Sequence, residues 1–210
     1  MKTSLGTLIL LSCGLLVGNV AAQQSKVQTG NIDQTQSGQG ATQTMDLGNV
    51  KGSGKSDVQT KNIKQQQSGG QGNTQSMGVG NVTGSGQSKV RTGDVTQTQS
   101  GTQNKQEMKL GNVQGGGKSD VNVNKVTQSQ QGAGNNQKMG VGNVVGSGQS
   151  KVQAGNLSQT QGGTANKQDM QIGNVSGGVG AKSDVKVGNV TQGQSGQGNT
   201  QKLNVGNATQ

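Results

Sequence analysis

The chain has 210 residues, of which 40 are glycine and none is proline, histidine or aromatic, and its formal net charge at pH 7 is +10. So few large apolar side chains exclude an ordinary globular core, and without a sequence period such a composition is typical of disorder. The absence of histidine and of stacking aromatic residues also argues against an enzyme, a cofactor or metal site, and specific nucleic-acid binding.

Residues 1–22 differ from the rest of the chain. Lys2 supplies a positive start, "LGTLILLSCGLLVG" an apolar run, and "VAA" a small-residue cleavage pattern that ends at Ala22. This pattern predicts a secretory signal peptide, and hence a secreted protein, and it is too short to span a membrane. The segment "LLSC" leaves lipoprotein cleavage at Cys13 as an alternative, although the apolar run continues past the cysteine.

Cleavage after Ala22 would leave a mature chain without cysteine, and therefore without disulfides. Without Lys2, the 17 remaining Lys and Arg residues against 8 Asp and Glu residues leave a net charge of +9. Such a charge is typical of a solubilising surface, and it also allows weak adhesion to anionic polymers.

From residue 23 onwards one pattern repeats six times. Each unit reads roughly S-x-V-x-T-G-N-V-x-Q-x-Q-S-G, then N-x-Q-x-M-x-V-G-N-V, then a Gly-rich turn such as "GSG". The period predicts a single repeat domain, 23–210, built from stacked units. The units are 24–54, 55–86, 87–117, 118–148, 149–181 and 182–210, and they begin at Gln24, Lys55, Gln87, Lys118, Gln149 and Lys182.

Within a unit the residue pattern alternates with a period of two, which predicts β-strands. In the third unit Ser88, Val90 and Thr92 alternate with Lys89 and Arg91, so that one face of the strand is reserved for inward side chains. The "GN" pairs skip one residue of this alternation, and we expect a bulge or a corner there. Because the chain contains no Asn-Gly or Asp-Gly pair, β-arcs are favoured over hairpins.

The predicted fold is therefore all-β: a β-solenoid of six stacked coils of about 31 residues, with parallel strands joined by β-arcs and about 4.8 Å apart. Six coils at that spacing would form a rod of roughly 28 Å.

Stacking the units brings equivalent inward residues into columns. Buried amides in such columns can donate to one another, which avoids a penalty of a few kcal/mol for each unpaired group. Three columns are glutamines: Gln34, Gln65, Gln97, Gln128, Gln159 and Gln192; Gln36, Gln67, Gln99, Gln130, Gln161 and Gln194; and Gln43, Gln75, Gln106, Gln137, Gln168 and Gln201. Two further columns are aliphatic: Val27, Val58, Val90, Val121, Val152 and Val185; and Met45, Met77, Met108, Met139, Met170 and Leu203, whose methionines we interpret as core and not as a metal site.

One outward column alternates in charge. Stacked about 4.8 Å apart, each charge would have opposite neighbours, and each exposed pair would contribute about 0.2–1 kcal/mol. We interpret the column as a device that sets the register of head-to-tail assembly, and the alternative is that a two-unit block was duplicated three times. The column is Lys26, Asp57, Lys89, Asp120, Lys151 and Asp184.

The segments "VTQTQSGTQNKQEMKL" (95–110) and "IKQQQSGGQGNTQSMGV" (63–79) resemble the repeats of bacterial functional amyloids, above all the curlins and more loosely the Fap fibre subunits. The shared scheme is an alternating strand with Gln, a Gly-containing turn, then Asn and a second alternating strand. The resemblance implies a secreted subunit that polymerises with itself into extracellular or cell-surface fibres of a biofilm matrix or an adhesive surface, together with export machinery or a nucleator.

The ends of the repeat domain agree with this expectation. The first unit starts directly at "QQSKV" and the last stops at "VGNATQ", whereas monomeric solenoids protect their terminal coils with caps. Exposed strand edges are templates for another chain, so we expect head-to-tail polymerisation.

Two other functions stay open. The first is a monomeric binding solenoid, an adhesin or an ice-binding protein, suggested by Thr96 and Thr98 on the outer face. The second is a matrix polymer that stays disordered. The pairs equivalent to Thr96 and Thr98 in units one, two and six interrupt a regular lattice: Asp33 with Thr35, Lys64 with Gln66, and Thr191 with Gly193.

Overall fold

The computed structural model describes residues 23–37, 39–40, 42–69, 71–178, 180–206 and 208–209. The predicted signal peptide, residues 1–22, lies outside the described residues. Throughout the described ranges the regular elements are β-strands, and none of these residues forms a helix long and apolar enough to cross a membrane.

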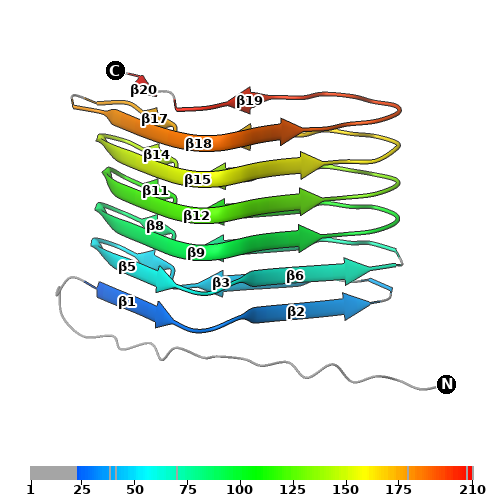
Figure 1. Ribbon diagram of the computed structural model, residues 1–210, viewed down its shortest axis with the longest axis horizontal. Helices are drawn as coiled ribbons and strands as arrows, with labels where there is room; N and C mark the ends of the chain where they lie inside the picture. Colours follow the sequence, from blue (N-terminus) through cyan, green and yellow to red (C-terminus); the bar gives the residue numbers. More distant parts are fainter. Residues whose placement is uncertain are drawn as a thin grey trace.

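The chain winds into six stacked coils, and each coil contributes to three parallel sheets (Figure 1). Strand partners lie 31 to 33 residues apart, as Val121 with Val90 and Gln149 with Lys182 show. The predicted β-solenoid is therefore confirmed, as are its parallel strands and its repeat length.

The sheet at the front of Figure 1, which we call the long-strand sheet, is the largest. Its strands are divided in the first two coils and continuous in the later ones. They are β1 (Gln23–Gln28), β2 (Ile32–Ser37), β5 (Gly54–Gln59), β6 (Ile63–Ser68), β9 (Gly86–Thr98), β12 (Gly117–Ser129), β15 (Gly148–Thr160) and β18 (Lys182–Gln192).

Two smaller sheets complete each coil. The second sheet consists of β3 (Gln43–Leu47), β7 (Gln75–Val79), β10 (Gln106–Leu110), β13 (Met139–Val141), β16 (Met170–Gln171) and β19 (Leu203–Asn204). The third consists of β4 (Val50–Lys51), β8 (Val82–Thr83), β11 (Val113–Gln114), β14 (Val144–Val145), β17 (Val175–Ser176) and β20 (Ala208–Thr209).

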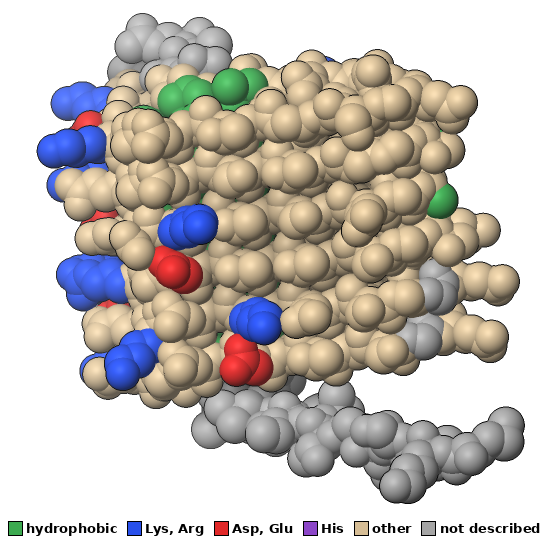
Figure 2. All heavy atoms as spheres, turned by 45° about the vertical axis from the view of Figure 1, so that its right-hand side comes forward, with side chains coloured by type: hydrophobic (Ala, Val, Ile, Leu, Met, Phe, Trp, Pro, Cys, Tyr) green, Lys and Arg blue, Asp and Glu red, His purple; other side chains and the backbone are tan. Residues whose placement is uncertain are grey.

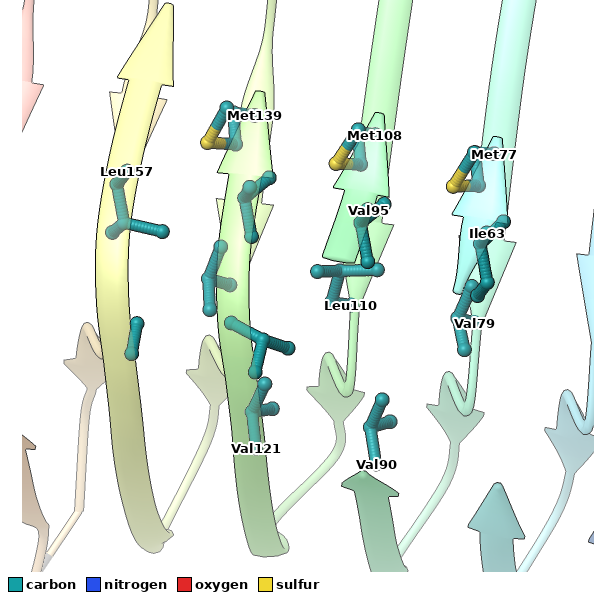
Figure 3. Packing of buried hydrophobic residues seen from close by; sticks show 14 of the residues in the cluster. Ile63, Met77, Val79, Val90, Val95, Met108, Leu110, Val121, Met139 and Leu157 are labelled. Carbon is teal, nitrogen blue, oxygen red and sulfur yellow. The ribbon is translucent and has the colours of Figure 1, made fainter. Parts of the chain in front are cut away.

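The core consists of columns of identical or similar side chains. Met77, Met108 and Met139 lie in one row along the stack, and Val90 and Val121 lie in another (Figure 3). Both valines are fully buried, because each is covered by its counterparts in the coils on either side. A second, smaller cluster is formed by the valines of the third sheet: Val50, Val82, Val113, Val144 and Val175, with Ala181.

Each unit has two positions that read Gly-Asn in the repeat pattern, and they have different shapes; the first of them reads Lys-Asn, Gly-Asp and Asn-Lys in units two, three and four. At the first position the long strands of the third to sixth coils continue, but the alternation of inward and outward side chains shifts by one residue. In β9, Thr92 and Val95 are both buried, with Gly93 and Asp94 between them. At the second position the chain turns a corner from the second sheet into the third. The glycine there, such as Gly80 (φ +64°), adopts the left-handed region.

A serine from the next coil stabilises this corner. Ser88 Oγ donates a hydrogen bond to the carbonyl oxygen of Gly80, and the equivalent serines do the same in the other coils. A Cβ atom at Gly80 would lie 2.6 Å from Val90 Cγ2, so only glycine lets the corner approach the valine column.

We therefore expect Gly80→Ala to destabilise the solenoid. The left-handed backbone alone disfavours alanine by about 1–2 kcal/mol, and the overlap with Val90 adds to it. In a chain of this size each kcal/mol lowers the Tm by roughly 2–4 °C, which a circular dichroism melt would detect. Gly163→Ala is the matched control, because a Cβ there meets no atom within 4 Å. Equal Tm values for both variants would contradict the packing of this corner.

Candidate assembly interface

The third glutamine column forms a hydrogen-bonded amide ladder. Gln75 Nε2 donates to Gln106 Oε1 at 3.0 Å, Gln106 donates to Gln137 at 2.9 Å, and Gln137 donates to Gln168 at 3.2 Å. These four side chains are fully buried, whereas Gln201, the last member of the column, is exposed. The ladder thus links the second to the fifth coil.

A main-chain carbonyl orients each amide of this ladder. Gln75 Nε2 also donates to the Thr98 carbonyl oxygen at 3.2 Å, and Gln106 Nε2 donates to that of Ser129 at 3.0 Å. Both acceptors are the last residues of long strands, β9 and β12. The amide nitrogen is thereby anchored on the opposite sheet while its oxygen faces the neighbouring coil.

The first two glutamine columns differ from this expectation. Their members are brought together, as Gln97 with Gln128 and Gln36 with Gln67, and from the second to the fifth coil they are buried. The amide atoms of Gln97 and Gln128, however, have no hydrogen-bond partner among the described residues. The physical difference is that these amides lack the main-chain anchor of the third column. The same holds in the described structure for Gln65, Gln67, Gln99, Gln130 and Gln159.

An asparagine ladder was not among the sequence predictions. Asn104 Nδ2 donates to Asn73 Oδ1 at 3.2 Å, Asn135 donates to Asn104 at 2.9 Å, and Asn166 donates to Asn135 at 2.9 Å. All four are buried. The sequence signal for them was the asparagine that opens the N-x-Q segment of units two to five.

These ladders predict that equivalent glutamines contribute differently to stability. Gln106→Leu leaves Gln137 Oε1 without its donor and removes one of the two acceptors of Gln75 Nε2, so the free energy of unfolding should fall by about 1–3 kcal/mol for the group left unsatisfied. Gln97→Leu removes an amide that has no partner in the described structure, so its effect should be neutral or stabilising. Urea unfolding of the two variants measures both values, and a larger loss for Gln97→Leu would contradict the assignment.

The alternating charge column lies in register on the outward side of the long-strand sheet. Lys26 pairs with Asp57, Asp57 with Lys89, and the alternation continues through Asp120, Lys151 and Asp184. The column is therefore geometrically continuous. Within the described part of the chain, however, the one ion pair closer than 4.0 Å joins Lys109 Nζ to Glu107 Oε1, at 2.7 Å on the second sheet.

A second column of alternating charge runs along the second sheet, and sequence reasoning missed it. Glu107 is followed at equivalent positions of the next coils by Lys138, Asp169 and Lys202. The hydrogen bond from Lys109, together with the positive charges of Lys109 and Lys138, lowers the pKa of Glu107, although partial burial opposes the shift. The signal in the sequence was that the charge at this position changes sign from each repeat unit to the next, as it does in the column at Lys26.

The last coil presents an open sheet edge. Among the described strands, β18 pairs only with β15, and β19 pairs only with β16. Side chains that are fully buried inside the stack are therefore partly uncovered at this coil: Leu203 is 47% exposed and Val205 is 41% exposed. At the other end β1 and β2 likewise pair on one side within the described residues, with β5 and β6.

None of the Asp and Glu side chains of the described residues form a group of three or more that could hold a metal ion. The comparisons with known protein families, with curated proteins and with solved structures found no match for this chain.

Proposed function

We propose that the protein is a secreted structural subunit that assembles head to tail into extracellular amyloid-like fibres, as a component of a biofilm matrix or an adhesive surface. The observation that carries the proposal is the open edge of the last coil, where β18 has an unpaired strand edge and Leu203 is half exposed. An unpaired edge of a flat parallel sheet is a template for another strand, and an apolar side chain beside it adds a favourable burial.

The two end coils match one another as neighbouring coils do. If the first coil of one copy stacks on the last coil of another, the serine column, two aliphatic columns, a glutamine column and the methionine column continue with residues of the same or a similar kind. The pairs formed would be Ser183 with Ser25, Val185 with Val27, Val190 with Ile32, Gln192 with Gln34, and Leu203 with Met45.

Only the head-to-tail arrangement keeps the parallel pairing of the stack. It would also place Asp184 of one copy beside Lys26 of the next, which continues the alternating charge column across the junction. Joining two like ends would bring like charges together and reverse the strand direction. The predicted signal peptide, 1–22, supports secretion.

Purified protein should form β-rich fibres after a lag, and preformed fibre fragments should shorten that lag. The physical reason is that the fragments supply open coil edges on which each new chain can pair. Electron microscopy and fibre diffraction should show a reflection at about 4.7–4.8 Å along the fibre axis, the spacing of the strands. A lag that fragments leave unchanged would rule out templated addition.

A matched pair of variants tests the open edge in this assay. Leu203→Lys should stop elongation, because at the junction its charge would be buried against Met45 of the next copy, which costs several kcal/mol. Thr191→Lys places the same charge on the exposed outward face of the same coil and should elongate normally. Equal elongation by both variants would show that this coil is not the assembling end.

The charge column offers an independent test of the junction. Asp184→Lys should slow elongation at low salt, and adding Lys26→Asp should restore it, although each exposed pair contributes only about 0.2–1 kcal/mol. Because Lys26→Asp creates a further like-charge contact with Asp57 inside the molecule, recovery can only come from the junction between copies. The column has no role in assembly if the double variant elongates no faster than the single one, or if high salt leaves the defect in place.

One observation favours a monomeric binding solenoid as the second candidate. The register places two columns of hydroxyl groups side by side on the outward face of the third to fifth coils. A stable monomer at high concentration in size-exclusion chromatography, together with inhibition of ice growth, would favour this function over the fibre. The hydroxyl groups are those of Thr96, Thr98, Thr127, Ser129, Ser158 and Thr160.

A further inference from the structure

Positive charge gathers on one strip of the surface, the outward side of the first half of the long strands. Figure 2 shows Lys and Arg side chains in a vertical stripe along one side of the stack. We call this surface the basic strip. It consists of three outward columns of side chains, which begin at Gln24, Lys26 and Gln28 of the first coil and continue through their stacked partners in the other coils. It contains eight basic residues, Lys26, Lys55, Lys89, Arg91, Lys118, Lys151, Lys182 and Lys186, and three acidic ones, Asp57, Asp120 and Asp184.

The outermost column of the strip has lysine in every second coil. Lys55, Lys118 and Lys182 alternate there with glutamines, and no acidic residue occupies the column. The lysines are exposed, and none of the three has an ion-pair partner in the described structure. Their ammonium groups recur at twice the strand spacing of about 4.8 Å, which is a regular linear array along the stack.

A groove of about 570 Å³ lies beside the strip, at the bend of the long strands. Its floor is formed by Thr92, Val123 and Ala154, which are stacked partners, so the groove runs along the stack and across the strands. Gln153 and Lys186, which are also stacked partners, line its side.

We propose that the groove and the basic strip bind a linear acidic polysaccharide that lies parallel to the stack axis. Carboxylates of the polymer would face the lysines, and its hydroxyl groups would bond to the exposed amides of Asn122 and Gln153. A sugar in an extended chain advances by nearly one strand spacing of about 4.8 Å. In a polyuronate, which carries one carboxylate on every sugar, every second carboxylate would therefore lie beside one of the outer lysines.

The composition favours a polysaccharide over a nucleic acid as the partner. Binding of single-stranded nucleic acid relies on aromatic side chains that stack on bases, and on arginine. The chain has no aromatic residue, and Arg91 is its one arginine. The amide and hydroxyl groups beside the groove instead provide the donors and acceptors that sugar hydroxyls require.

The proposal does not rest on fibre formation, because one copy contains the whole groove. In a head-to-tail fibre the column would continue across the junction, where Lys182 of one copy meets Gln24 of the next in the same alternation. A polymer that spans several copies would then bind with the added strength of multivalency.

The test measures binding of the full chain to immobilised alginate, a polyuronate, with neutral dextran and single-stranded oligothymidine as comparison ligands. The strip variant is Lys55→Gln with Lys118→Gln and Lys182→Gln, because glutamine already occupies this column in the alternate coils. The control variant is Lys51→Thr with Lys105→Asn and Lys167→Asn. It removes three exposed charges from outside the strip in favour of residues found at these positions in adjacent coils.

The strip variant should bind alginate at least about tenfold more weakly, with a smaller dependence on salt between about 50 and 200 mM, because it releases fewer counterions. The control variant should lose less than about twofold in affinity for alginate. The separate variant Gln153→Glu places a negative charge beside the groove, so it should also bind alginate more weakly than the unchanged chain. Equal losses for the two triple variants would overturn the proposal in favour of a diffuse charge effect. Binding of oligothymidine or dextran as tight as that of alginate would overturn the polysaccharide assignment.

Discussion

Nearly everything in this protein depends on one constraint: in a parallel stack in register, each side chain lies about 4.8 Å from its own counterparts above and below. Residues that pair well with themselves can therefore fill the columns. Amides qualify because they both donate and accept, as Gln106 does with Gln137, and valines qualify because they pack against copies of themselves, as Val90 does with Val121. A charged side chain repels a copy of itself, and accordingly Lys89 lies beside Asp120 of the next coil.

The same constraint explains how a chain with so few large apolar residues can be ordered. A single coil buries too little surface to be stable alone, so stability comes from the interfaces between coils. The end coil shows what is lost without a neighbour: Val152 is fully buried, whereas its partner in the last coil, Val185, is only partly covered. The last coil thus leaves uncovered, within the described residues, the same kind of surface that holds the stack together.

A two-coil period is superimposed on the one-coil period in two outward columns of the long-strand sheet. The outward column at Lys26 alternates in sign, and the neighbouring column at Lys55 alternates between lysine and glutamine. The buried columns do not follow this alternation, because a core column needs the same shape in every coil. Length differences between units are absorbed in the turns: the 33-residue step between Gln149 and Lys182 leaves the strand register intact.

The sequence by itself determined the coil number, the all-β class, the inward columns and their register, because a shift by one period carries each residue onto its counterpart. Only the tertiary structure decided which amides bond. Gln106 has an anchor on the facing strand and Gln97 has none, and this depends on where the Ser129 carbonyl lies in the opposite sheet. It also decided that one Gly-Asn position bends the strand while the other, at Gly80, turns a corner. The two positions differ because their surroundings differ: one lies inside a long strand, and the other lies between two sheets.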